Sequence, residues 1–310
     1  MFDFILPLLC FNLTIKVNNQ EKLPGSFEQI YKKSGNKYQP EFVLAKQNMD
    51  LYIIIRDVVD ITDFLIILDY VPFDFHGSKV HHGVFLAAKW VIEQCKNDIA
   101  NCNGKIFVTG YSLGASVASM IATILRYEEN YNNVFAFGFG GIPILGKSIA
   151  KNTRSFITNF VVNQDLFPAL NPKNFDNIIQ SIVPKGSSEA VQGAMIINDA
   201  IKELALSLEE QNHGKVSDEM KNAINAESMH ISTILLNNVG NADNFEDLVN
   251  PGIVYHLLLI DKNYVDIKKF DENIQINSVF EIISVLKDHM INVYKEVLYS
   301  SKNEKYPDYL

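Results

Sequence analysis

A serine between two glycines, placed after a β-type run and before a helical run, is the feature that most constrains this chain. Residues 106–108 are apolar β-formers, a pattern typical of a buried strand. Residues 110–114 follow with the sequence Gly-Tyr-Ser-Leu-Gly. The small and apolar residues of 115–125 then keep helical spacing. A strand, a tight turn and a helix in this order predict an α/β fold that presents Ser112 on the turn.

The chemistry of this turn suits a nucleophile. Glycines on both sides of Ser112 permit the strained backbone that lifts the hydroxyl clear of the sheet. The N–H of Leu113, at the start of the helix, would face the oxygen that becomes negative when Ser112 attacks a carbonyl. The same five-residue pattern also occurs by chance as a serine in an ordinary glycine turn. The flanking strand and helix favour the nucleophile.

Composition and charge limit the partners of the chain. Its 310 residues are 47% hydrophobic and include 20 Phe, enough for a sizeable core and too apolar for a disordered chain. The net charge is −9 and Lys and Arg form no block, which argues against a nucleic-acid partner. Since an acidic surface gains nothing from anionic lipid, we expect any membrane contact to be apolar.

The N-terminus leaves three interpretations open. Residues 2–13 are apolar but contain Asp3 and no positive region, which makes a poor signal peptide. They are also too few for a transmembrane helix, which needs about 20 residues. A weak signal, the remnant of an anchor and an ordinary core segment all remain open. The three cysteines form no disulfide framework and no metal-binding spacing, so we expect a cytoplasmic or peripheral membrane-associated protein, with secretion not excluded.

Alternating strand and helix patterns predict a mostly parallel sheet flanked by helices. Residues 186–250 are polar and rich in Asn and Glu, so we expect a helical insertion there within a single domain. The expected elements are a helix at 21–33, a hairpin of 42–45 with 51–55, a helix around 84–95, strands at 106–108, 134–139, 156–162 and 253–260, a strand-like run at 280–283, and a closing helix from about 290.

A serine nucleophile needs a carboxylate that orients its base, and in α/β hydrolases the acid follows the serine in the chain. Many acids follow Ser112, but only Asp165 stands where an apolar strand ends and a proline, Pro168, forces a loop. Catalytic groups of open α/β sheets lie at such strand ends. Asp165 is therefore the candidate acid, and a solvated turn is its alternative interpretation.

Four histidines follow Ser112 and compete as the base. His213 and His230 lie in the polar insertion, where nothing anchors them, and His256 lies inside an apolar run typical of a core strand. His289 follows the final apolar run and precedes a helix, a position from which a base could reach Ser112. We therefore expect His289 to be the base, with an exposed terminal histidine as the alternative. The pair His81 and His82 precedes the serine, which is the wrong order for this fold.

These motifs resemble the class 3 lipase family, and within it the diacylglycerol-lipase-like branch. The resemblance covers about Pro40–Leu298 and is specific in combining the serine elbow with a D-H-x4-Y motif. It implies an α/β-hydrolase fold, a triad of Ser112, Asp165 and His289, and no cofactor or metal. It is carried by PEFVLA with LYIIIR, HHGVFLAAKW, IFVTGYSLGASVASMIA, FAFGFGGIP, VVNQDLFP, PGIVYHLLL and FEIISVLKDHMINVY.

The chain departs from the family at the strand that supplies the second oxyanion donor. Where the family has Arg-Gly-Thr or Arg-Gly-Ser, this sequence has Arg56-Asp57-Val58. The resemblance assigns the donor role to the N–H of Val58, which brings no hydroxyl. A charged Asp57 about 4 Å from a forming oxyanion would be unfavourable by about 1 kcal/mol in water and about 4 kcal/mol at a partly buried site. Either Asp57 points away or turnover is reduced.

The resemblance implies a serine ester hydrolase, a lipase that cleaves acylglycerols or phospholipids at a membrane or droplet interface. The alternative is a catalytically impaired lipase-like protein that binds or scaffolds lipid, and the intact triad candidates favour the enzyme. The apolar residues 64–68 occupy the position of the family's lid, although the same residues could be ordinary core. The sequence gives no signal for the oligomeric state.

Overall fold

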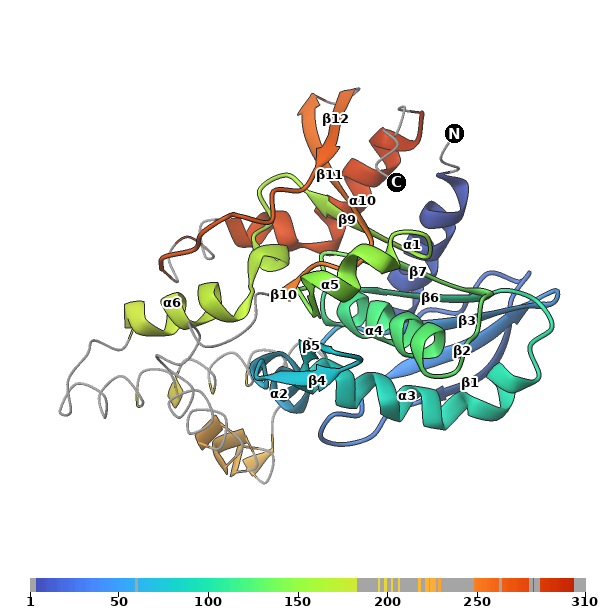
Figure 1. Cartoon of the computed structure of the whole chain (residues 1–310), viewed down its shortest axis with the longest axis horizontal. Coiled ribbons are helices and arrows are strands. Elements are labelled where there is room, and N and C mark those ends of the chain that lie inside the picture. The colour runs from blue at the N-terminus through green and yellow to red at the C-terminus, as the bar shows by residue number, and fades with distance from the viewer. Residues whose placement is uncertain are drawn as a thin grey trace.

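An eight-stranded sheet forms the centre of the protein in the computed structural model (Figure 1). The structure describes residues 4–58, 61–182, 248–261, 264–278, 281 and 285–303, with scattered positions between 195 and 229. The strands lie in the order β1 (Glu28–Lys33), β2 (Phe42–Gln47), β3 (Asp50–Ile55), β6 (Ile106–Tyr111), β7 (Val134–Phe139), β9 (Ile157–Val162), β11 (Ile253–Asp261) and β12 (Tyr264–Lys269).

The central part of this sheet is parallel. Strands β3, β6, β7, β9 and β11 run in the same direction, and β1, β2 and β12 extend the two edges as antiparallel strands. The mostly parallel sheet confirms the predicted α/β class. Pairing of Ile55 with Gly110, Tyr111 with Phe139, and Phe139 with Phe160 aligns the carboxyl ends of β3, β6, β7 and β9 at one edge. Polar side chains that follow these strands therefore meet there.

Helices cover both faces of the sheet and divide the core into two layers. Along β3 the side chains alternate: Ile53 and Ile55 face one layer, and Tyr52 and Ile54 face the other. The first layer holds α3 (His82–Ala100) and α4 (Leu113–Tyr127), and the second holds α1 (Ile5–Asn18) and α10 (Ile291–Ser300). The other described helices are α2 (Ile61–Leu68), α5 (Lys147–Ala150), α6 (Pro172–Ile182) and the 3-10 helices η1 (Lys151–Thr153), η2 (Phe167–Ala169), η4 (Leu286–His289) and η5 (Ser301–Asn303).

The N-terminal helix is part of the core. Phe11 and Leu13 on α1 are fully buried and belong to the same layer as Phe107 of β6. This packing favours the core interpretation over a signal or an anchor for the described residues of this segment. Within the described part of the chain, no helix combines the length and apolarity needed to cross a membrane.

The predicted secondary structure differs from the structure at three places within the described residues. The segment predicted as a helix at 21–33 ends in strand β1, because its backbone pairs with β2 and the Tyr31 hydroxyl reaches Asp98 Oδ2 at 2.8 Å. Strand β12 was not predicted, since it is an edge strand with exposed polar residues. Of the strand-like run at 280–283, only Glu281 is described, and it is helical.

A second, smaller sheet was also not predicted. Its strands lie in the order β10 (Leu248–Val249), β8 (Leu145–Gly146), β5 (Ser78–His81) and β4 (Pro72–Phe75), and neighbouring strands are antiparallel. Two-residue strands such as β8 carry too little pattern to be recognised from sequence.

The apolar run at 64–68 lies in α2, and its described side chains are buried. Leu65 and Ile66 are 1% and 0% exposed, and Ile66 belongs to the same core layer as α3. This packing favours the core interpretation of the run, although a closed lid would bury the same residues. The predicted insertion at 186–250 lies mainly outside the described residues and stays a prediction.

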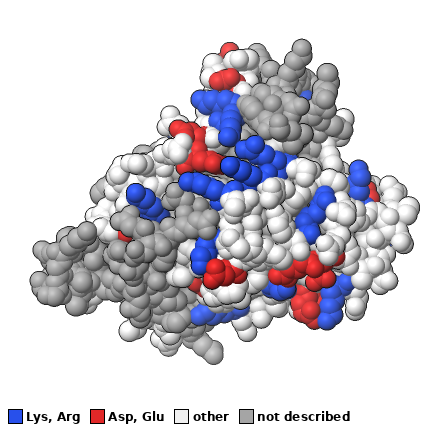
Figure 2. Space-filling view, viewed as in Figure 1, with Lys and Arg blue, Asp and Glu red and all other residues white. Residues whose placement is uncertain are grey.

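Surface charge is uneven despite the acidic total. Lys147, Lys151, Arg154 and Lys269 line a groove of about 200 Å³ together with Glu272. Figure 2 shows Lys and Arg side chains gathered in the middle of one face, around α5. This face therefore carries a local cluster of positive charge that the net charge of −9 does not reveal.

Candidate active site

Ser112 stands on a strained turn between β6 and α4. Its backbone has φ 55° and ψ −121°, an unusual conformation for a residue other than glycine. A side chain on Gly110 would collide with the backbone of Gly114, so glycine is required for this turn. The N–H of Ser112 still donates to Phe139 O at 2.8 Å, which ties the strained residue to the end of β7. The strand, turn and helix predicted around Ser112 are all present.

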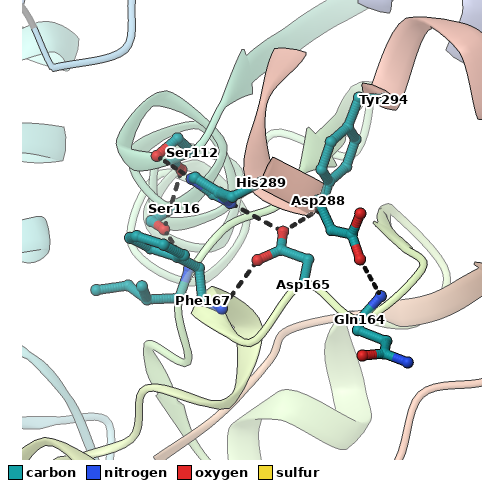
Figure 3. Close-up of polar contacts among 9 residues, drawn as sticks. Ser112, Ser116, Gln164, Asp165, Phe167, Asp288, His289 and Tyr294 are labelled. Carbon is teal, nitrogen blue, oxygen red and sulfur yellow. Dashed lines mark hydrogen bonds and ion pairs between the residues drawn. The ribbon is translucent and has the colours of Figure 1, made fainter. Parts of the chain in front are cut away.

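Ser112, His289 and Asp165 are hydrogen-bonded in series (Figure 3). His289 Nε2 lies 3.0 Å from Ser112 Oγ, and His289 Nδ1 lies 2.9 Å from Asp165 Oδ2. The three side chains come from the ends of β6 and β9 and from η4, over a sequence separation of 177 residues between Ser112 and His289. The fold therefore brings together the three residues that the sequence selected.

Asp165 is held by two donors in addition to His289. The Tyr294 hydroxyl donates to Asp165 Oδ2 at 2.5 Å, and the Phe167 N–H donates to Asp165 Oδ1 at 3.0 Å. The Asp165 side chain is fully buried, so these donors replace the water that an exposed carboxylate would bind. Together, the hydrogen bonds from His289, Tyr294 and Phe167 fix the orientation of the Asp165 carboxylate, with its Oδ2 directed at the imidazole.

The imidazole of His289 lies between two aromatic rings. The Phe167 ring stacks on it with centroids 3.7 Å apart, and the Tyr111 ring lies 5.3 Å away. Burial alone would lower the pKa of His289, but the charge and hydrogen bond of Asp165, with a further contribution from Asp57, raise it above its ordinary value. His289 is therefore a stronger base than a free histidine and is fixed in orientation.

The loop that carries His289 is tied to the loop that carries Asp165. Asp288 Oδ2 accepts a hydrogen bond from the N–H of Gln164 at 3.2 Å (Figure 3). Neither this contact nor those of Tyr294, Phe167 and Tyr111 were identified as functional from the sequence. The D-H-x4-Y spacing was the available signal for Tyr294, because the motif contains the tyrosine.

The expected oxyanion donors surround the carboxylate of Asp57. The N–H of Val58 donates to Asp57 Oδ1 at 2.7 Å. The hydroxyl of Ser112 and the N–H of Leu113 are near enough to lower the pKa of this carboxylate. Burial raises the pKa of Asp57, while His289 and these three donors act in the opposite direction. Of the two alternatives for Asp57, these contacts favour the one in which the carboxylate faces the site.

Two of the histidines that were set aside lie in structural roles. His81 is buried before α3, where its Nδ1 accepts from the Val84 N–H at 3.4 Å, and burial lowers its pKa to about 4. His256 Nε2 lies 2.6 Å from Asn163 O on the partly buried strand β11. His213 and His230 lie outside the described residues. Among the described side chains, no group of three His, Cys, Asp or Glu could hold a metal ion.

Comparisons with known proteins relate part of this chain to a protein family and to solved structures. Residues 58–175 match the family model described as Lipase (class 3), and curated protein sequences give no match. A fungal lipase–inhibitor complex is similar at 22% identity and TM-score 0.46, over 56% of this chain and 76% of that chain. A lipase from Rhizopus microsporus var. chinensis is similar at 15% identity and TM-score 0.47, over 56% and 70%. The triacylglyceride lipase of Rhizomucor miehei is similar at 21% identity and TM-score 0.43, over 53% and 73%.

The family match includes the serine elbow and Asp165, and it begins at Val58, beside the site. It ends before η4 and does not reach His289. Residues 58–175 of this chain are therefore similar to the class 3 lipase family.

Proposed function

We propose that this protein is a serine ester hydrolase that cleaves acyl esters of acylglycerols or related membrane lipids, as in the diacylglycerol-lipase-like branch of the family. The observation that carries the proposal is the series of hydrogen bonds from Ser112 to His289 and from His289 to Asp165, at 3.0 and 2.9 Å. These distances lie within the reach that a nucleophile, its base and an orienting acid require.

In the first half of the reaction, Ser112 Oγ attacks the ester carbonyl while His289 Nε2 takes its proton. The carbonyl oxygen becomes the oxyanion of a tetrahedral intermediate. The imidazolium then gives the proton to the departing alcohol as the ester C–O bond breaks, which leaves an acyl group on Ser112. In the second half, His289 activates a water that releases the fatty acid and restores the Ser112 hydroxyl.

Asp165 has the role of orienting and stabilising the imidazolium. Its Oδ2 holds the Nδ1–H, which leaves Nε2 free to face Ser112. The N–H groups of Leu113 and Val58 are the proposed oxyanion donors. Since the Val58 N–H donates to Asp57, a substrate carbonyl reaches this N–H only when that carboxylate has moved.

The proposed substrate is a lipid because apolar side chains surround the nucleophile. Leu113, Ile142 and Phe167 lie in or against the main core layer near Ser112, and they suit an acyl chain better than a charged group. We propose that the substrate is met at a membrane or droplet interface. A protein that binds lipid without turning it over is the second candidate, and it is favoured by the Asp57 carboxylate at the expected oxyanion site.

Labelling with a fluorophosphonate probe, wild type beside Ser112→Ala, tests the proposal. We expect covalent labelling and hydrolysis of p-nitrophenyl butyrate by the wild type, and neither by Ser112→Ala. Ser155→Ala, at an exposed serine, is the matched control and should keep both. His289→Ala should lower kcat by about 10³-fold or more, and Asp165→Ala by a similar order. Labelling that persists in Ser112→Ala would contradict the assignment of the nucleophile.

A further inference from the structure

The segment 56–58 is pressed against the first turn of α4. Ile55 pairs with Gly110, so β3 ends beside the strand that carries Ser112. A Cβ atom on Gly114 would lie 2.5 Å from Ile55 O and 3.0 Å from Arg56 O. The backbone after β3 therefore has no room to move closer to α4. This close approach places the side chain of residue 57 beside the turn that carries Ser112.

The backbone of Asp57 is anchored from outside the site. Its N–H donates to Asn18 Oδ1 at 2.8 Å, from the end of α1. Arg56 is held in turn, since its N–H donates to Glu41 O at 2.9 Å and its Nη1 to Glu41 Oε1 at 3.1 Å. The guanidinium of Arg56 is thus bound to Glu41. These contacts fix the position from which the Asp57 carboxylate enters the site.

The carboxylate of Asp57 lies among the groups that would bind an oxyanion. It accepts from the N–H of Val58 at 2.7 Å, one of the two donors proposed to hold the tetrahedral intermediate. The N–H of Leu113, the second proposed donor, and the Ser112 hydroxyl are near enough to lower the pKa of this carboxylate. A negative oxygen in this place is favoured by the N-terminus of α4, a helix of 15 residues. A substrate oxyanion and the Asp57 carboxylate therefore compete for the same donors.

The charged groups around Asp57 also connect it with the base. His289 faces it from η4 and favours the carboxylate form, and the negative charge of Asp57 in turn favours protonated His289. Tyr111 on β6 faces the same carboxylate, and its pKa is raised by burial and by the charges of Asp57 and Asp165. When His289 is protonated, its Nε2–H donates to Ser112 Oγ. In that arrangement the serine has no free base.

From this geometry, and resting on the proposed role of Ser112, we propose that Asp57 is a further residue of the active site. In the resting protein its carboxylate occupies the oxyanion position and holds the site closed, and hydrolysis requires the substrate carbonyl to displace it. The Asp57 side chain thus determines how often Ser112 is available for attack, and it adds to the pH dependence of the site.

Substitutions at Asp57 test this proposal through the rate of covalent labelling. We expect Asp57→Gly to label with a fluorophosphonate about 10- to 100-fold faster than wild type, because the Val58 N–H is released for the phosphoryl oxygen and a nearby negative charge is removed. Asp57→Asn keeps the size and loses the charge, so its rate should lie between the two. Asp74→Asn, on an exposed side chain of β4, makes the same change in net charge and should label at the wild-type rate.

The pH profile of labelling gives a second readout that a purely structural role would not move. Because Asp57 raises the pKa of His289, the rate should fall on acidification at a lower pH in Asp57→Asn than in wild type. If wild type labels and neither variant is faster or shifted, the inference is wrong while the proposed function stands. If no form labels at Ser112, the proposed function fails and the inference fails with it. Should Asp57→Gly not fold, the rate and profile of Asp57→Asn decide alone.

Discussion

The hydroxyl of Tyr294 and the imidazole of His289 donate to the same oxygen of Asp165, at 2.5 and 2.9 Å. Both donors come from the C-terminal part of the chain, His289 from η4 and Tyr294 from α10, five residues apart. One carboxylate oxygen therefore fixes the orientation of the base and joins the closing helix to the end of β9. Loss of the tyrosine hydroxyl should affect both the base and the stability of the fold.

We expect Tyr294→Phe to lower kcat by about 10-fold and the free energy of unfolding by about 1.5–3 kcal/mol. The ring packing is kept, and one hydrogen bond to a buried charge is lost. The measurements are ester hydrolysis and a thermal melt. Tyr299→Phe is the control, because its hydroxyl binds Asn12 Oδ1 on the exposed side of the same helix. Equal effects of the two substitutions would contradict a special role for Tyr294.

His256→Ala should lower stability and leave the chemistry intact. His256 Nε2 is bonded to Asn163 O and its ring packs against Phe270, so the substitution removes packing and leaves a carbonyl without its partner. We expect a lower melting temperature with kcat within about threefold of wild type for the folded protein. The comparison is His289→Ala, for which we expect kcat to fall by about 10³-fold or more in the folded protein. The reverse pattern would mean that the base has been misassigned.

Buried His81 should make the protein sensitive to acid. Its pKa is lowered from 6.5 to about 4 by burial, so the unfolded chain takes up a proton at a higher pH than the folded protein does. This histidine therefore opposes folding increasingly as the pH falls from about 6.5 to about 4, by an amount on the order of 3 kcal/mol.

His81→Asn tests this expectation, since Asn can still accept from the Val84 N–H. Melting temperatures measured from pH 7 to pH 4 should fall less steeply in His81→Asn than in wild type. His76→Asn replaces an exposed histidine and should follow the wild-type curve. Identical slopes for wild type and His81→Asn would show that other groups govern the loss of stability in acid.

Gly114→Ala should separate the first turn of α4 from the end of β3. The added carbon would lie 2.5 Å from Ile55 O, a contact that the backbone can relieve only by moving apart. We expect a loss of about 1–3 kcal/mol in the free energy of unfolding, typical of overpacking, and slower labelling of Ser112. Gly25→Ala, where an added carbon meets open space, is the control and should change neither quantity.

The sequence was informative where local pattern and chemistry coincide. The elbow at Ser112 could be predicted because its strand, its glycines and its helix are contiguous in the chain. Strands β7, β9 and β11 were predicted because they are apolar on both faces of the sheet. Edge strands β1 and β12 could not be predicted, because only their pairing with β2 and β11 distinguishes them from polar helix or loop.

By itself, the sequence determined the α/β class, the candidate residues Ser112, Asp165 and His289, and the presence of a carboxylate, Asp57, beside the expected oxyanion donor Val58. It could not say where that carboxylate points, because the orientation of Asp57 depends on Asn18, Val58 and the first turn of α4, which the chain brings together only on folding. The tertiary structure also decided that Tyr294 and Phe167 serve Asp165 and His289. Hydrogen bonds between residues more than a hundred positions apart leave no periodic pattern in a sequence, and they form only when the sheet aligns its strand ends.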